Sequence, residues 1–314
     1  MENQNKIAAI IQSMEQIIVG KRDVIELSLI TLLAGGHLLL EDVPGVGKTT
    51  LAKTLANTID CGFTRIQFTP DTLPSDVTGL SIYNMQTGKF EYSKGAIMNN
   101  IILADEINRT SPKTQASLLE AMEEKQVTVD GVSYPLCKPF MVIATQNPVD
   151  YLGTYNLPEA QLDRFMMKLS IGYPQAGEEK MMVDRFLSRQ FEKKPEPVVD
   201  GETVISMQEE VELVKVNQDL ITYTTRIIQE TRKDSNISLG ASPRATLALI
   251  RASQARAYIK GRNYVIPDDI IELVQPVISH RLILSPEARI SQIKVDRILK
   301  NIVSRIPVPV LKGE

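Results

Sequence analysis

A loop near residue 45 has the residue types and spacing needed to hold a polyphosphate. It spans residues 41–50, EDVPGVGKTT, and lies between the apolar run 38–40 and the helix-forming stretch 51–56. A strand that turns through glycines into a helix points successive backbone amides at one place, where the helix N-terminus adds partial positive charge. The sequence therefore predicts that the chain binds a nucleoside triphosphate.

Individual residues of this loop are expected to have separate roles in binding the phosphates and Mg²⁺. Gly45 and Gly47 let the backbone approach the phosphates without a Cβ atom in the way. Lys48 would reach the outer phosphates, and Thr49 would offer its hydroxyl to Mg²⁺. The predicted nucleotide-binding residues of the loop are Pro44, Gly45, Val46, Gly47, Lys48, Thr49 and Thr50.

Asp42 departs from the usual pattern, G-x-x-x-x-G-K-[ST], which has glycine at this position. Aspartate tolerates left-handed backbone conformations better than most residues, so we expect the turn to survive the replacement. An ordinary glycine-containing loop is the alternative interpretation, and the strand-loop-helix context argues against it.

An acidic pair, Asp105 and Glu106, ends the apolar run 100–104. At the carboxyl edge of a parallel sheet, Asp105 would lie near the phosphate loop and hold Mg²⁺ directly or through water. Glu106 would orient and polarise the attacking water. A solvated strand end is the alternative, but the distance of about two βα units from the loop favours the catalytic interpretation.

Three further polar residues are candidates for acting on a terminal phosphate. Asn147 follows the run 140–145 and could hydrogen-bond the attacking water and the phosphate, although a turn asparagine before proline is the alternative. Arg164 is expected at a subunit edge, from which it would act on a neighbouring subunit. Arg244 lies in a first helical turn, from which it could contact the phosphates and couple the second domain to nucleotide state. Surface ion pairs are the alternative for both arginines.

These residues must be brought to one edge of a sheet. Nearly continuous apolar runs alternate with helical patterns up to residue 174, which indicates a buried, mostly parallel sheet. We therefore predict an α/β fold, with a nucleotide-binding domain at 1–174 and a small helical domain at 175–314. The predicted strands are 38–40, 64–68, 100–104, 140–145 and 165–171.

Helix start signals support the second domain. They are a capping box at Ser206 and Glu209, the pair 242–243, and the segment 267–269. Two hairpins are predicted within the first domain, at 81–92 and 126–135, the second around an Asp-Gly turn. They are candidates for contact with a partner or a central pore, with surface insertions as the alternative.

The composition describes a globular chain of 314 residues with 43% hydrophobic residues and a formal charge of −3. This charge gives no global attraction to nucleic acid or anionic membranes. The apolar region 24–40 is interrupted by a charge, a glycine pair and a histidine, so no transmembrane helix is expected. No secretory signal is apparent, and a cytoplasmic protein is expected. Cys61 and Cys137 suggest neither a disulfide nor a zinc site, and His37 and His280 are expected to pack or lie on the surface.

Several segments together resemble the MoxR family of AAA+ ATPases, and the resemblance covers almost the whole chain. The combination is specific even though single segments are weak. It implies an AAA+ P-loop domain with a five-stranded, mostly parallel sheet and a small all-helical lid domain. The segments are 42–50, 103–106, 108–116, 144–148, 157–165 and 242–245.

The resemblance also assigns roles to residues. Val19 and Gly20 match the stretch that closes over adenine in this superfamily, and the hairpins match the family's insertions. The remaining matches are Lys48 and Thr49 to Walker A, Asp105 and Glu106 to Walker B, Asn147 to sensor 1, Arg164 to the arginine finger and Arg244 to sensor 2.

By this resemblance the chain is a Mg²⁺-dependent ATPase that binds ATP. It is expected to form a homo-oligomer, a hexameric ring, that remodels or activates protein clients, with a von Willebrand factor A domain protein as a candidate partner. A nucleic-acid motor or loader is one alternative, which the balanced charge and the absence of tryptophan disfavour. A nucleotide-gated scaffold with little turnover is the other. No stable nucleic-acid binding and no membrane insertion are expected.

Overall fold

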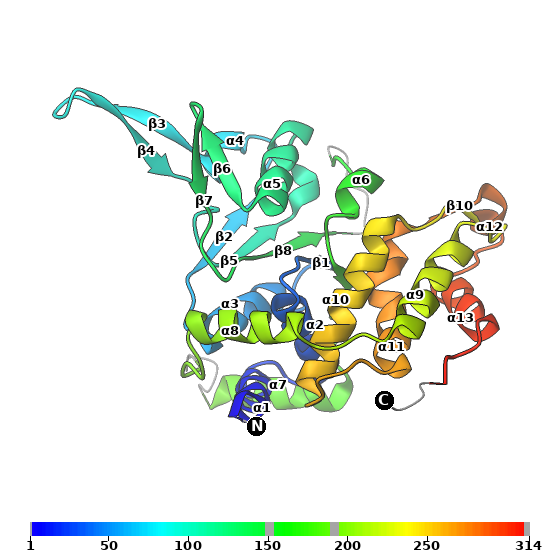
Figure 1. Cartoon of the computed structure of the whole chain (residues 1–314). Helices are drawn as coiled ribbons and strands as arrows, with labels where there is room; N and C mark the ends of the chain where they lie inside the picture. Colours follow the sequence, from blue (N-terminus) through cyan, green and yellow to red (C-terminus); the bar gives the residue numbers. More distant parts are fainter. Residues whose placement is uncertain (1, 148–153, 189–194, 311–314) are drawn as a thin grey trace.

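The computed structural model describes residues 2–147, 154–188 and 195–310. An α/β part built on one five-stranded sheet is followed by a region of helices (Figure 1). This architecture confirms the predicted fold class, a mostly parallel sheet followed by a small helical unit.

All neighbouring strands of the five-stranded sheet are parallel. Side chains alternate between the two faces: Leu38 and Leu40 belong to one core cluster and Leu39 to the other. Every residue of β5 is buried, as its continuous apolar run predicts. The strands in spatial order are β2 (Phe63–Gln67), β5 (Ile101–Asp105), β8 (Met141–Gln146), β1 (Leu38–Glu41) and β9 (Met167–Leu169).

Strand β9 is shorter than the predicted run 165–171. The Phe165 amide donates to the Leu162 carbonyl and so belongs to the preceding turn. At the other end, the Ile171 amide donates to the Asp42 carboxylate. Phe165 and Ile171 are nevertheless buried, so the apolar run reflects packing beyond the strand itself.

Helices cover the sheet and complete the two cores. The stripe of Ile7, Ile10, Ile11 and Met14 on α1 is buried against one core, as its helical spacing predicts. The helices of the α/β part are α1 (Glu2–Glu15), α2 (Arg22–Leu33), α3 (Lys48–Thr58), α4 (Pro74–Thr78), η1 (Ile107–Arg109), α5 (Pro112–Glu124) and α6 (Glu159–Leu162).

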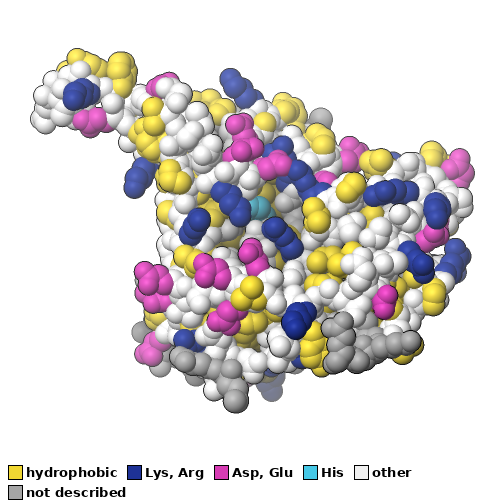
Figure 2. Space-filling view, in the orientation of Figure 1, with side chains coloured by type: hydrophobic (Ala, Val, Ile, Leu, Met, Phe, Trp, Pro, Cys, Tyr) yellow, Lys and Arg dark blue, Asp and Glu magenta, His cyan; other side chains and the backbone are white. Residues whose placement is uncertain are grey.

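Two antiparallel hairpins extend from this part (Figure 1). Tyr92 of the first and Tyr134 of the second stack with ring centroids 4.0 Å apart, so the bases of the hairpins support each other. Figure 2 shows hydrophobic and charged side chains mixed on the projecting end of the first hairpin. The hairpin strands are β3 (Gly79–Asn84), β4 (Lys89–Lys94), β6 (Gln126–Val129) and β7 (Val132–Pro135).

In its described residues the C-terminal region is helical apart from one short antiparallel strand pair and an isolated bridge between Lys215 and Tyr264. None of the helices in the described ranges is long and apolar enough to cross a membrane. The elements are α7 (Ala176–Leu187), α8 (Gly201–Glu212), α9 (Gln218–Thr231), β10 (Ile237–Leu239), α10 (Pro243–Ile259), α11 (Pro267–Ile278), η3 (Ser279–Arg281), β11 (Ile283–Leu284), α12 (Pro286–Ile290) and α13 (Val295–Arg305).

Two of the three predicted helix starts are confirmed. Ser242 caps α10, and Pro267 is the first residue of α11. The predicted capping box at Ser206 is wrong, because α8 already begins at Gly201. Its N-cap is Asp200, whose carboxylate accepts a hydrogen bond from the Thr203 amide at 2.8 Å. The sequence signal at Ser206 lies inside the helix that Asp200 starts.

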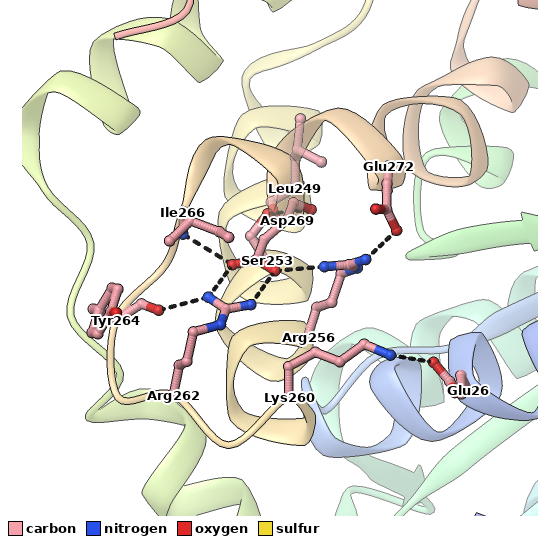
Figure 3. A network of polar contacts seen from close by, with 10 residues as sticks. All are labelled: Glu26, Leu249, Ser253, Arg256, Lys260, Arg262, Tyr264, Ile266, Asp269 and Glu272. Carbon is pink, nitrogen blue, oxygen red and sulfur yellow. Dashed lines mark hydrogen bonds and ion pairs between the residues drawn. The ribbon is translucent and has the colours of Figure 1, made fainter. Parts of the chain in front are cut away.

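A buried carboxylate, Asp269, holds the first turn of α11 against α10 (Figure 3). It accepts hydrogen bonds from Arg256, Arg262 and the Ile266 amide. Burial alone would raise the pKa of Asp269, but the hydrogen bonds from Arg262, the Ile266 amide and Arg256 outweigh burial and lower the pKa. Lys260 of the same network pairs with Glu26 of α2 at 2.9 Å and thereby links the helical region to the α/β part.

The segment after residue 174 contacts the α/β part at several points. Gln208 of α8 donates to the Leu32 carbonyl of α2 at 2.7 Å. Arg185 of α7 donates to the Gln16 carbonyl. The division at 174 and 175 stays a prediction.

The buried side chain of His37 connects β8 to α5 through hydrogen bonds. Its Nδ1 atom accepts from the Val142 amide at 3.1 Å, which leaves Nε2 to donate to the Met122 carbonyl at 3.3 Å. This arrangement requires the neutral ring. Burial, assisted by the charge of Lys125, lowers the pKa of His37 to about 4.

We expect the free energy of unfolding to fall as the pH is lowered from about 6.5 towards 4. The unfolded chain binds a proton at His37 in this range and the folded chain does not, which contributes a slope of about 1.4 kcal/mol per pH unit. Urea denaturation of the wild type and of His37→Gln at several pH values measures this slope. The variant should lose that part of the pH dependence, and equal slopes in the two proteins would contradict it.

Candidate functional site

The phosphate loop connects β1 to α3 with a backbone that requires glycine at two positions. Gly45 has φ 86° and Gly47 has φ 95°, both in the left-handed region, and Gly47 is the N-cap of α3. A Cβ atom built at either glycine meets nothing within 4 Å. The backbone conformation, and not the available space, therefore selects glycine here.

Lys48, the first residue of α3, folds back over this loop. Its Nζ atom donates to the Asp42 carbonyl at 2.7 Å and to the Val43 carbonyl at 3.3 Å. The ammonium group is therefore held at the mouth of the loop. Phosphate oxygens are stronger acceptors for it than neutral carbonyls, because their hydrogen bonds are charge-assisted.

Asp42 has a different role from the one expected. It is not among the residues with positive φ, so a left-handed conformation does not explain its presence. Its buried carboxylate accepts hydrogen bonds from the Ser170 hydroxyl at 2.9 Å, the Ile171 amide at 2.5 Å and the Gly172 amide at 3.2 Å. Asp42 thus fastens the start of the phosphate loop to the end of β9.

The acidic pair lies at the end of β5 with both carboxylates engaged. Asp105 accepts from Arg65 at 2.6 Å and from the Thr145 hydroxyl at 2.7 Å. Glu106 accepts from Gln67 at 3.0 Å and from Arg109 at 2.8 Å. These contacts fix two adjacent carboxylates at the strand end.

Glu106 also has an unusual backbone. Its φ of 56° and ψ of 49° are left-handed, where a residue with a Cβ atom is uncommon. Its amide donates to the Thr145 hydroxyl at 2.8 Å, so Thr145 binds both members of the acidic pair. Glu106 lines the same cleft as Asp105, and a backbone held in this sparsely populated conformation is typical of functional sites.

The loop and the acidic pair line one cleft of about 470 Å³. The structure thus brings together most of the residues predicted for the nucleotide and the metal, including Asn147. Val46 instead packs against a hydrophobic core. The lining residues are Pro44, Gly45, Gly47, Lys48, Thr49, Thr50, Arg65, Gln67, Asp105, Glu106 and Asn147.

The sequence pattern does not identify Arg65, Gln67 and Thr145 as site residues. Arg65 and Gln67 are two residues apart on β2, so they share one face of that strand. A strand prediction shows this alternation but does not show that β2 pairs with β5, where Arg65 lies opposite Leu103 and Gln67 opposite Asp105. Arg65 and Gln67 become site residues because β2 pairs with β5, which carries the acidic pair at its end.

The cleft suits Mg²⁺ bound together with phosphates. Within the described ranges no group of three or more histidine, cysteine, aspartate or glutamate residues could hold a metal alone. Magnesium needs fewer protein ligands when phosphates and waters complete its octahedron. The Thr49 hydroxyl and the Asp105 carboxylate, both in the cleft lining, supply oxygen ligands of the required kind.

The two predicted arginines lie elsewhere. Arg164 pairs with Glu123 at 3.1 Å, and Arg244 pairs with the other oxygen of the same carboxylate. Neither arginine belongs to the cleft lining that the described residues form. The sequence predicts that Arg244 could contact the phosphates, whereas the structure places it beside Arg164 at the end of α5.

The predicted adenine segment also lies outside this lining. Val19 is buried. Gly20 has φ 72°, and a Cβ atom there would lie 1.9 Å from Oε1 of Glu178, a residue of α7. The described lining includes residues predicted to contact the phosphates and the metal, and the adenine contact of Val19 and Gly20 stays a prediction.

Comparisons with known proteins agree with this architecture. Residues 37–167 match the family described as "ATPase family associated with various cellular activities (AAA)", and residues 229–302 match the AAA lid domain. A crystal structure of a protein assigned as an ATPase from Cytophaga hutchinsonii has a TM-score of 0.92 and 41% identity, covering 98% of this chain and 96% of that one.

Two sequence relatives extend over nearly the whole chain. YeaC of Bacillus subtilis, an uncharacterized protein, is 53% identical over 307 residues, covering 96% of this chain and 95% of YeaC. Chaperone MoxR1 of Mycobacterium tuberculosis is 38% identical over 304 residues, covering 94% of this chain and 80% of MoxR1. Fold and site together define an AAA+ P-loop protein with a helical lid. The chain belongs to the MoxR family of AAA+ ATPases.

We expect Asp42→Gly, which restores the usual loop pattern, to destabilise the protein. Removing the carboxylate leaves one hydroxyl and two amides without their acceptor, at a cost of about 2–4 kcal/mol in the free energy of unfolding. Urea denaturation without nucleotide measures the loss. Ser170→Ala removes only one donor and should cost about 1 kcal/mol. An Asp42→Gly protein as stable as the wild type would show that the anchor is unnecessary.

Proposed function

We propose that this chain is a Mg²⁺-dependent ATPase that works as a ring-shaped oligomer, a hexamer, and remodels or activates protein clients in the cytoplasm. The observation that carries the proposal is the shared cleft of Lys48, Thr49, Asp105, Glu106 and Asn147. Such a cleft unites a phosphate cradle with the groups needed to activate water.

The polar groups that carry the proposal have separate roles in the proposed hydrolysis. The amides of the loop and Lys48 bind the outer phosphates. Thr49 and Asp105 would hold Mg²⁺, which would supply neutralising positive charge at the phosphates. Glu106 orients the attacking water and accepts its proton. Asn147 binds the terminal phosphate from the end of β8.

The arginines act on the cleft of a neighbouring subunit in this proposal. Their position outside the lining of their own cleft supports it, as does their shared partner Glu123. Arg164 has 30% and Arg244 46% of its side chain exposed, and surface ion pairs of this kind are worth only about 0–1 kcal/mol. A phosphate from a neighbour can replace Glu123 at little cost.

Client contact is proposed for the projecting hairpin of β3 and β4. Several large hydrophobic side chains are exposed on it, and Met85 at its turn is 91% exposed. A related protein is named Chaperone MoxR1, which supports the proposal of a protein client here. A protein with a von Willebrand factor A domain is the partner we propose to test. The hydrophobic residues are Leu80, Ile82, Tyr83, Met85 and Phe90.

We expect Glu106→Gln to bind ATP with nearly unchanged affinity and to lower kcat about 100- to 1000-fold, because only the group that accepts the proton is lost. Steady-state hydrolysis and the fluorescence titration of a labelled ATP analogue measure the two effects. Lys48→Ala is the matched control and should lose binding itself. If Glu106→Gln hydrolyses ATP as fast as the wild type does, Glu106 is not the general base.

We expect Arg164→Ala subunits to regain turnover when they are mixed with Glu106→Gln subunits. Arg164→Ala alone should lose about 1000-fold in kcat, because a missing arginine leaves transition-state charge uncompensated. In mixed rings the clefts of Arg164→Ala subunits receive arginines from Glu106→Gln neighbours. Specific activity of the wild type should also rise with protein concentration.

A mixture of Glu106→Gln with Lys48→Ala is the control for this experiment, because neither variant has a complete cleft. It should stay inactive. Hydrolysis per subunit that is flat under dilution to monomer, together with no rescue in the first mixture, would exclude the action of Arg164 between subunits.

A further inference from the structure

The turn η3 of the lid holds both neighbours of Arg164. The side chain of Arg281 is only 2% exposed and forms an ion pair with Asp163, the residue before Arg164. Its Nη2 atom also donates to the Phe165 carbonyl, the residue after Arg164, at 2.7 Å. His280 contacts the same carbonyl through Nε2 at 3.0 Å. Three side-chain contacts of the lid thus hold the residues on both sides of Arg164.

The second oxygen of Asp163 reaches the start of α10. It accepts from the Ser242 hydroxyl at 2.8 Å, while Oδ1 faces Arg281. Ser242 is the N-cap of α10, and its hydroxyl also accepts from the Arg244 amide at 3.1 Å. One carboxylate therefore connects the segment of Arg164 to the segment of Arg244.

Burial distinguishes this connection from the contacts of the arginines themselves. Asp163 is 18% exposed and Arg281 2%, whereas Glu123 is 37% exposed. Breaking a buried pair leaves an uncompensated charge, while an exposed pair exchanges readily with water or another anion. The guanidinium groups of Arg164 and Arg244 can change partner while their backbones stay joined through Asp163.

We propose that Asp163 is a positioning residue that fixes the start of α10 and the turn η3 to the Arg164 segment. The backbones of Arg164 and Arg244 then keep a fixed relative position for the cleft of the neighbouring subunit, because Phe165 is buried in the core of the α/β part and Asp163 joins both lid segments to it. This inference rests on the proposed function, in which both arginines serve that cleft. The chemistry is unchanged, and Asp163 acts only through the two arginines.

The test is Asp163→Asn, which keeps the size of the side chain and removes the charge that Arg281 needs. We expect kcat to fall about 10- to 100-fold while the affinity for a labelled ATP analogue changes less than twofold, because the variant's own cleft is intact. Mixing with Glu106→Gln subunits should restore turnover, since these supply correctly placed arginines. A merely structural defect would not be rescued in this way.

Asp269→Asn is the matched control. Asp269 is also a buried carboxylate of the lid with arginine partners, but its contacts are within the helical region and do not touch the Arg164 segment. Its kcat should stay within about twofold of the wild type, although its stability falls. A tenfold loss in Asp269→Asn that mixing also restores would show that any lid damage has this effect, and would overturn the inference.

Ser242→Ala provides a second test that keeps the buried ion pair. It removes the link from Asp163 to α10, and we expect a loss of about three- to tenfold in kcat that mixing with Glu106→Gln again restores. Ser285→Ala is its control, because Ser285 caps α12 with the same Ser-Pro start and accepts from the Ala288 amide at 3.2 Å. Ser285→Ala should keep wild-type turnover.

The outcomes separate the two proposals. If Arg164→Ala is not rescued by mixing, the proposed action of Arg164 between subunits falls, and this inference falls with it. If Arg164→Ala is rescued but Asp163→Asn and Ser242→Ala turn over like the wild type, or lose activity without rescue, only this inference falls.

Discussion

The site depends on one constraint: the carboxyl ends of β1, β5 and β8 lie together at one edge of the parallel sheet. Leu40 of β1 lies opposite Thr145 of β8, and Ala104 of β5 lies opposite Ala144. Asp105 is therefore level with Thr145 and within hydrogen-bonding distance of its hydroxyl. Because parallel strands all end on the same side, the phosphate loop, the acidic pair and Asn147 are delivered to one cleft.

The polar groups of this cleft are held in place by hydrogen bonds within the protein. Asp42 fastens the loop to the end of β9, and Arg65 and Thr145 hold Asp105. Each hydrogen bond reduces the freedom that would otherwise be lost on binding, which favours affinity for a ligand of matching shape. The loop glycines supply the backbone amides and add no side chains to the cleft.

The ion pairs around Arg164, Arg244 and Asp163 differ from one another in how much they contribute to stability. Arg164 and Arg244 share an exposed glutamate, and such pairs contribute about 0–1 kcal/mol. Asp163 and Arg281 lie deeper, where removing one partner costs about 3–5 kcal/mol. Exposed guanidinium groups on a buried base can exchange a carboxylate partner for another anion at little cost.

The sequence by itself determined the succession of strand, phosphate loop and helix from β1 to α3. Glycine, lysine and threonine at this spacing after an apolar run leave few other conformations. It also determined the acidic strand end and the helical C-terminal region, since apolar runs and proline-capped helix starts are local signals. Tertiary structure decided what depends on neighbours in space. Arg65 joins the site only because β2 pairs with β5, Asp42 is an anchor only because β9 ends beside it, and Arg244 meets Glu123 because the lid packs there. Local patterns carry backbone preference and burial, whereas pairing of strands and packing of the lid arise from contacts between segments far apart in the chain.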